Sequence, residues 1–186
     1  KKAMRRVTEG ISETLGIERV GVWLFDKSTG NLVNQDTFLA SKKRHVSGEV
    51  LDVSQYLPEF EALRKASYVA ADDALSDPRL AGYVEGYIKP LHITSMLDVL
   101  IHIGDEQLGA LCLEQVDIPH HWEDDEIAFA NQLADQLALT IVNRDRLDFI
   151  QRLRVSEERQ RAILEALPDL FFVIAADGTF LDAYAP

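Results

Sequence analysis

The chain contains 186 residues, of which 47% are hydrophobic and 27% charged, and it carries a formal net charge of −12. This length fits one domain of ordinary size plus additional structure, and the composition excludes a disordered chain. Nucleic acids and anionic membranes require a positive protein surface, so the negative charge disfavours both as partners.

The cysteine content and the apolar runs indicate the compartment. Cys112 is the single cysteine, which excludes an internal disulfide and a thiolate metal cluster and fits a reducing environment. The apolar runs are far shorter than the roughly 20 residues that span a bilayer, and no signal peptide follows the basic start KKAMRR. We therefore expect a cytoplasmic chain that makes no membrane contact.

The elements in the first half of the chain follow from apolar spacing and from the residues that interrupt it. Amphipathic runs repeat at helical spacing, and β-rich runs are bounded by Gly, Asp and Ser. Asp77-Pro78 marks the start of one helix and Lys89-Pro90 its end. The predicted elements are a helix at 3–15, a hairpin of strands at 20–25 and 32–39, a loop at 41–49, a helix at 56–66, a short strand within 67–74 and a helix at 77–89.

The second half of the chain predicts a hairpin, a very long helix and a second hairpin. The two strongest strands, 95–103 and 107–116, are joined by the tight connection GDEQ. A helix that begins near the carboxylates of EDDE continues without Gly or Pro to Ala166, so part of it must leave the domain. The tail DLFFVIAADGTFLDAYAP predicts two strands around an Asp177-Gly178 turn. Two strands do not make a stable domain, so we expect the start of a second module.

The strand at 95–103 has one apolar face and one mixed face, because successive side chains alternate. The apolar face suits a helix-covered core and contains Leu97, Val99, Ile101 and Ile103 with Leu111 and Leu113 of the next strand. The mixed face contains Met96, Asp98, Leu100 and His102 with Ala110, Cys112 and Glu114. Mostly apolar surfaces with a few polar groups are typical of ligand pockets. His102 lies near the strand end, where we expect it to face solvent.

Five segments, in this order and spacing, resemble the GAF family of small-molecule sensing modules in bacterial signalling proteins. They are VGVWLFD, SGEVLDVSQYLPEFEAL, VAADDALSDPRL, HITSMLDVLIHIGDEQLGALCLEQV and WEDDEIAFANQLADQLALTIVNR. The tail ALPDLFFVIAADGTFLDAYAP resembles the opening of a PAS domain. The resemblance implies an α+β fold with a GAF-like, PAS-related antiparallel β-sheet, terminal helices on one face and a ligand cavity on the other.

The resemblance also implies an organisation and a function. Residues 1–143 would form a GAF sensory domain, 144–167 a helical signalling linker and 168–186 the truncated start of a PAS domain. The expected function is non-catalytic: an unidentified small molecule binds, and the signal passes along the C-terminal helix to the PAS domain and to a histidine kinase or GGDEF-type diguanylate cyclase. The alternative is a ligand-free structural dimerisation module of the same signalling protein. The cofactor is unknown, and no nucleophile–base pair or metal set in the sequence supports an enzyme.

Asp98 and Glu114 are the main pocket candidates. Each could line the pocket, or it could cap a loop N–H or pair with a nearby Arg, since a buried carboxylate needs a partner. Arg79 could hold an anionic ligand group or pair with Asp72 or Asp73. Aromatic residues on the expected roof helices, Phe60 among them, could line the pocket or only pack the roof against the sheet. The full candidate set is Met96, Asp98, Cys112, Glu114, Tyr56, Tyr83, Tyr87 and Arg79.

Several specific ligands are disfavoured. The spacing of His45, His92, His120 and His121 matches no metal-ligand pattern, so we interpret them as loop histidines, with haem left open. Cys112 lies within a strand, whereas bilin-binding GAF relatives attach the pigment from another region, so a structural thiol is favoured. The GAF-like free-methionine-sulfoxide reductases need several cysteines for turnover, so the single Cys112 argues against that activity. Cyclic-nucleotide-binding relatives carry an Asn-Lys pair upstream of an Asp-Glu pair. This chain has Asp125-Glu126 but no suitable Asn-Lys pair before it, so a cyclic nucleotide is disfavoured as the ligand.

A seven-residue repeat extends over 142–167. One position contains Val142, Phe149, Ser156 and Ile163, and the position four later contains Arg146, Leu153, Gln160 and Leu167. Five of these eight residues are apolar, which predicts a weak coiled coil with a polar middle. We therefore expect a homodimer through the terminal helices, with a plain helical spacer as the alternative. The predicted dimer and signalling residues are Val142, Phe149, Leu153, Ile163 and Leu167.

Overall fold

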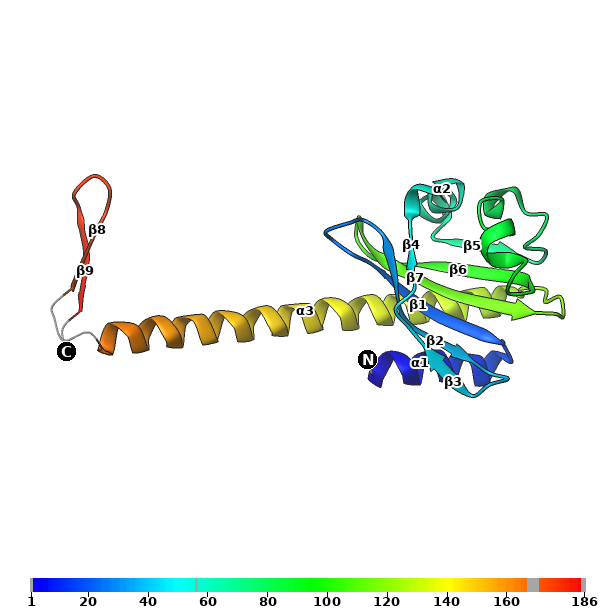
Figure 1. The fold of residues 1–186 in the computed structure, drawn as a ribbon, viewed down its shortest axis with the longest axis horizontal. Helices are drawn as coiled ribbons and strands as arrows, with labels where there is room; N and C mark the ends of the chain where they lie inside the picture. Colours follow the sequence, from blue (N-terminus) through cyan, green and yellow to red (C-terminus); the bar gives the residue numbers. More distant parts are fainter. Residues whose placement is uncertain (1, 56, 167–170, 185–186) are drawn as a thin grey trace. The chain divides into compact units, whose positions relative to one another are not determined.

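The structure, a computed structural model, describes residues 2–55, 57–166 and 171–184. Contacts between residues divide the chain into two units, 1–139 and 140–186. Within the described residues, the first unit contains a seven-stranded antiparallel sheet with helices on both faces, which confirms the predicted α+β class (Figure 1).

The sheet has the strand order β3-β2-β1-β7-β6-β5, and β4 pairs with β2. The chain therefore brings its first hairpin, β1 and β2, beside its last one, β6 and β7. All neighbouring pairs are antiparallel. The strands are β1 (Arg19–Phe25), β2 (Leu32–Leu39), β3 (Arg44–Val46), β4 (Val50–Leu51), β5 (Tyr68–Ala71), β6 (Ile93–Ile103) and β7 (Glu106–Val116).

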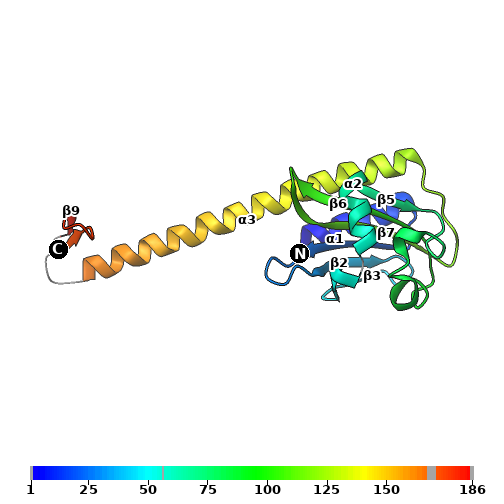
Figure 2. The ribbon, with the colours of Figure 1, turned by 90° about the horizontal axis from the view of Figure 1, so that it is seen from above.

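The helices lie on opposite faces of this sheet. In both views, α1 (Lys2–Leu15) and the first turns of α3 (Asp124–Ala166) cover one face, while α2 (Leu57–Ala66) covers the other (Figures 1 and 2). The buried residues of the α3 turns recur at helical spacing, and most of them are alanines. These buried residues are Ala130, Ala134, Leu137 and Ala138.

Strands β1 and β7 approach each other closely at Gly109. A Cβ atom at Gly109 would lie 1.9 Å from the carbonyl oxygen of Trp23, which leaves no room for a side chain. Glycine at this position therefore permits the pairing of Leu24 with Gly109, next to the pairing of Trp23 with Ala110. This register directs the Trp23 side chain toward the α2 face, where it lines a cavity.

The structure differs from the sequence prediction in two segments. Residues 77–89 form two short turns, a 3-10 turn η2 (Pro78–Leu80) and a π-helical turn η3 (Val84–Ile88), so the predicted continuous helix is wrong. Gly82 and Gly86 interrupt that segment, and each glycine in a helix interior costs about 1 kcal/mol relative to alanine. The predicted loop at 41–49 contains β3, which has three residues and is too short to show a period. A further 3-10 turn, η1 (Val53–Gln55), precedes α2.

The second unit contains the later turns of α3 and a hairpin of β8 (Phe171–Ile174) and β9 (Phe180–Tyr184). The continuous helix predicted as far as Ala166 is confirmed, since α3 has 43 residues. Both predicted C-terminal strands are present, whereas Leu167 lies outside the described residues. Among the described helices, none combines the length and apolarity that crossing a membrane requires.

Candidate functional site

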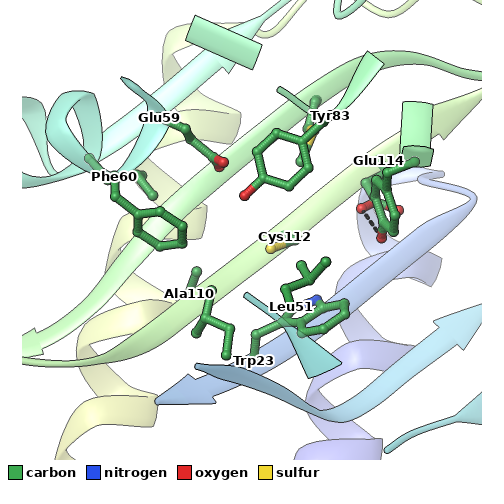
Figure 3. A pocket seen from close by; sticks show the side chains of 12 residues that line it. Trp23, Leu51, Glu59, Phe60, Tyr83, Ala110, Cys112 and Glu114 are labelled. Atoms are coloured by element: carbon green, nitrogen blue, oxygen red, sulfur yellow. Dashed lines mark hydrogen bonds between the residues drawn. The ribbon is translucent and has the colours of Figure 1, made fainter. Parts of the chain in front are cut away.

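A cavity lies between the sheet and α2 (Figure 3). Its volume is about 20 Å³, which is room for about one water molecule. Side chains therefore fill most of the space on this face of the sheet. The polar and aromatic groups of its wall are Trp23, Glu59, Phe60, Tyr83, Tyr87, Cys112 and Glu114.

The mixed face predicted for the two long strands is the face that contacts this cavity. In the β6–β7 pairing, Met96 faces Glu114 and Asp98 faces Cys112. Met96, Cys112 and Glu114 line the cavity, and Asp98 is buried beside it with no exposed surface. His102, at the strand end, is partly exposed and contacts the carbonyl oxygen of Gly104 at 3.1 Å.

The opposite face forms the core under α1 and α3, as predicted. Leu97, Val99 and Ile101 are buried there together with their partners on β7, Leu111 and Leu113. The exception is Ile103, at the end of β6, which is exposed. Along β6 and β7, the two faces thus differ in polarity, and the carboxylates Asp98 and Glu114 lie on the α2 side.

Glu59 of α2 and Asp98 of β6 form a buried acidic pair. Burial raises the pKa of Asp98, and the neighbouring charge of Glu59 raises it further. Burial also raises the pKa of Glu59, against the opposing effect of hydrogen bonds with Asp98 and Tyr83. When both carboxyls are ionised, Asp98 is left with the weak donor Cys112 and makes no regular hydrogen bond among the described residues. A proton on Asp98 that is donated to Glu59 removes one of the two buried charges, and this is the arrangement that the pKa directions favour.

Tyr83 completes this end of the cavity. Its hydroxyl and the Glu59 carboxyl point toward each other above Cys112 (Figure 3). Burial raises the pKa of Tyr83 and Glu59 raises it further, so the hydroxyl keeps its proton. Burial and then Asp98 also raise the pKa of the Cys112 thiol, which favours an unreactive thiol over a nucleophile.

Glu114, at the other end of the cavity, has its partners in the protein. It accepts hydrogen bonds from Arg19 Nε at 2.6 Å and from the Tyr87 hydroxyl at 2.7 Å. The Arg19 guanidinium also lies over the Tyr87 ring, 5.9 Å from its centroid. Burial lowers the pKa of Arg19, but Glu114 and Tyr87 outweigh it, and the net direction is upward. The pairing with an arginine that the sequence left open for Glu114 is therefore confirmed.

The remaining predicted pocket residues divide into three cases. Tyr83 and Tyr87 both line the cavity, with their rings in an edge contact at 6.1 Å. Arg79 lies outside the described lining: it pairs with Asp77 and donates to the carbonyl oxygen of Ala70 at 2.7 Å. The alternative prediction that Arg79 pairs with Asp72 or Asp73 is therefore wrong. Tyr56 lies outside the described residues.

Four of the histidines each contact a different carboxylate. The pairs are His45 with Asp36 at 2.8 Å, His92 with Asp117 at 3.3 Å, His120 with Glu126 at 2.9 Å, and His121 with Asp72. Within the described ranges, no group of three or more His, Cys, Asp or Glu side chains is arranged to hold a metal ion.

Sequence reasoning missed Glu59, Trp23 and Arg19. A signal existed for Glu59, which falls on the same stripe of α2 as the buried Phe60 and Leu63. An acidic residue within an apolar stripe indicates a buried polar site. Trp23 and Arg19 share a face of β1 through strand alternation, but nothing in the sequence identifies that face as the one toward the cavity.

Comparisons with known proteins agree with this architecture. The model of the GAF domain family matches residues 1–141. The chain also resembles the blue-light absorbing form of the PixJ GAF domain of Thermosynechococcus elongatus. The sequence identity is 22%, the match covers 82% of this chain and 89% of that one, and the TM-score is 0.64. No curated protein matches the chain.

Two further solved structures have the same fold. The photoproduct state of GAF3 from Slr1393 of Synechocystis is 19% identical, with 81% of this chain and 98% of that one covered and a TM-score of 0.67. The GAF domain of an Acinetobacter phosphoenolpyruvate-protein phosphotransferase is 17% identical, with 75% and 80% covered and a TM-score of 0.61. At these identities, the comparisons show a common fold.

Proposed function

Since the chain belongs to the GAF domain family, whose members are in general non-catalytic sensory modules, we propose that residues 1–143 bind a small molecule in the cavity under α2. The observation that supports this most directly is the buried pair of Glu59 and Asp98. Apart from the contact between the two carboxyls and the weak donor Cys112 beside Asp98, neither Glu59 Oε2 nor the oxygens of Asp98 make a regular hydrogen bond among the described residues. A buried polar group without a partner costs about 1–3 kcal/mol, so its presence beside a cavity supports a ligand-binding role.

A ligand larger than water must displace part of the cavity wall. Leu51 lines the cavity from β4, which has two residues and pairs with β2 along one edge. A short strand with one partner opens at low free-energy cost compared with the central strands. We therefore assign the entrance to β4 and the neighbouring α2.

We propose that α3 carries the signal onward. The helix is continuous from its buried turns at Ala130 and Ala134 to Ala166, so a shift at the sheet is transmitted along one rigid element. The proposed recipients are a PAS domain that begins at 168 and an output histidine kinase or diguanylate cyclase. The β8–β9 hairpin supports a further module, because apolar side chains on it are exposed and need additional structure to cover them. These residues are Phe172, Ile174, Phe180 and Leu181.

A thermal-shift screen of metabolites, nucleotides, haem and biliverdin tests the sensory function. A ligand at 100 times its Kd adds about 2.7 kcal/mol to the free energy of unfolding. That gain raises the Tm of a chain of this size by roughly 5–10 °C. The matched control is Ala110→Leu, which fills the cavity from β7. A Tm increase lost in that variant supports the proposal. A complete absence of stabilising compounds, or an increase that persists in Ala110→Leu, contradicts it.

The exposed apolar residues of α3 favour a second function, dimerisation through this helix. Phe149 is 68% exposed and Leu153 49% exposed, and both occupy predicted seam positions. Ile163 is also exposed, and Val142 is half-buried. This function requires no ligand, and the small volume of the cavity is consistent with it.

Phe149→Glu is expected to weaken a dimer by at least tenfold in Kd. Burying one Phe side chain contributes about 1.5–3 kcal/mol, and a symmetric seam contains two copies. Gln151→Glu is the matched control, because it adds the same charge about 200° away around the helix. Light scattering across a concentration series measures both variants. A monomeric wild-type chain, or equal effects of the two substitutions, contradicts dimerisation along this seam.

A further inference from the structure

The cavity offers a ligand negative charge and hydrogen-bond acceptors. Among its described lining residues there is no Lys, Arg or His. Arg19 lies nearby, but its guanidinium is committed to Glu114 and the Tyr87 hydroxyl. An anionic ligand would therefore lie beside carboxylates with no free cation to balance the negative charges. The repulsion between like charges disfavours such a ligand.

The negative charge is unbalanced at one end of the cavity. Glu114 is neutralised by Arg19. Glu59 has no cationic partner among the described residues, is 3% exposed, and leaves its Oε2 atom without a donor at the cavity wall. Asp98 contacts Glu59 and the weak donor Cys112, and neither of its oxygens makes a regular hydrogen bond among the described residues. The group that is missing here is a donor that carries positive charge.

Aromatic rings surround this end of the cavity. Phe60 and Tyr83 lie on either side of Glu59, and Trp23 lines the cavity farther along, beyond Cys112 and beside Ala110 (Figure 3). A cation within about 6 Å of an aromatic ring face gains roughly 0.5–2 kcal/mol, and the gain is largest where water is excluded. Rings combined with a buried carboxylate form an environment that suits an ammonium group and also accepts its short alkyl chain.

We propose that the ligand of this domain is a small protonated amine whose ammonium group donates to Glu59 between these rings. This inference rests on the proposed sensory function and adds the chemical class of the ligand. The volume of about 20 Å³ accommodates ammonium or the head group of methylammonium, and a longer amine has to displace Leu51. On binding, the ammonium charge replaces the proton that Asp98 and Glu59 share, and that proton passes to the solvent.

Thermal shift and isothermal titration calorimetry on the 186-residue chain test this directly. The probes are ammonium, methylammonium and ethylammonium chloride, compared with sodium chloride at equal ionic strength. Ethanol and sodium acetate are the neutral and anionic probes of similar size. We expect the amines to raise the Tm at millimolar concentration, and acetate and ethanol to leave it unchanged. If acetate or ethanol raises the Tm as much as the amines do, the ligand is not a cation and this inference is wrong, while the proposed sensory function is unaffected.

Two variants locate the binding site. Glu59→Gln keeps the shape of the side chain and removes its charge, and it is expected to reduce amine affinity at least tenfold. Glu61→Gln is the matched control, because Glu61 is an exposed carboxylate on the same helix. Circular dichroism establishes that both variants fold. Unchanged amine binding in Glu59→Gln overturns the site.

Proton release provides an independent readout. Titrations in buffers of different ionisation enthalpy should show about one proton released for each amine bound. In Asp98→Asn that release should disappear. If an amine binds and no proton is released, the ammonium group does not replace the proton that Asp98 and Glu59 share, and that part of the inference is wrong. If no amine binds, the inference fails, and the wider metabolite screen then decides the sensory function separately.

Discussion

Replacement of Arg19 with methionine is expected to lower the free energy of unfolding by about 3–5 kcal/mol, the range observed when one partner of a buried ion pair is removed. Glu114 is 3% exposed, and its two partners are Arg19 at 2.6 Å and Tyr87 at 2.7 Å. Methionine retains most of the aliphatic volume of arginine. The lost free energy of unfolding therefore measures the cost of the unpaired Glu114 carboxylate rather than the cost of a new cavity. Urea unfolding at pH 7.5 measures the change.

The double variant Arg19→Met with Glu114→Gln is the control for this experiment. It removes both charges, so most of the lost stability should return, as expected for residues that act as a pair. Tyr87→Phe removes the hydrogen bond donated to Glu114 and the longer one accepted from Arg19, and should cost about 1–2 kcal/mol. An Arg19→Met variant within 1 kcal/mol of the wild type would mean that Glu114 is solvated or has another partner.

Replacement of Asp98 with asparagine is expected to raise the free energy of unfolding at pH 8 by roughly 1–3 kcal/mol, because it removes a buried carboxyl that lies beside the charge of Glu59. The groups around Asp98 are mostly acidic or neutral: Glu59 on α2, Tyr83, and Cys112 and Glu114 on β7. Asparagine has nearly the same shape and no charge, so it removes the desolvation cost and the repulsion by Glu59.

The pH dependence of stability gives the sign of this effect. The pKa of Asp98 is raised in the folded state, so between about 4 and that raised pKa the folded chain binds more protons than the unfolded chain. The contribution of Asp98 to stability is therefore fully present below pH 4 and is lost as the pH rises through the folded pKa. Asp98→Asn should remove this decline. Asp105→Asn, at an exposed carboxyl in the β6–β7 turn, is the control and should preserve it.

Chemical denaturation between pH 5 and pH 9 measures both variants. Asp98→Asn that destabilises the chain at every pH would indicate that the carboxylate has a strong partner in the folded protein. In that case the acidic pair would no longer support a ligand site.

Strand alternation predicted the most important part of the site. The period of two in β6 and β7 is sufficient to place Asp98, Cys112 and Glu114 on one face, opposite Leu97 and Leu111. This works because alternation is a local property of the backbone.

Contacts between distant segments could not be predicted in the same way. The meeting of Glu59 with Asp98 depends on how α2 crosses the sheet, which the pattern of neither segment contains. The helix predicted at 77–89 rested on Asp77-Pro78 as its start and Lys89-Pro90 as its end. Gly82 and Gly86 broke it into turns, and Tyr83 and Tyr87 nevertheless reach the cavity. The proposed domain limits at 143 and 167 remain predictions.

The alanines of α3 have a consequence for mechanics. Ala130, Ala134 and Ala138 are buried in the first turns of α3, which cover the face of the sheet opposite α2, and Leu137 is the large side chain that is buried with them. Methyl groups interlock weakly, so a small translation or rotation of the helix on the sheet requires few rotamer changes. The larger side chains on this stripe, buried Leu137 and half-buried Ile127 and Leu133, are therefore the ones expected to limit such a movement.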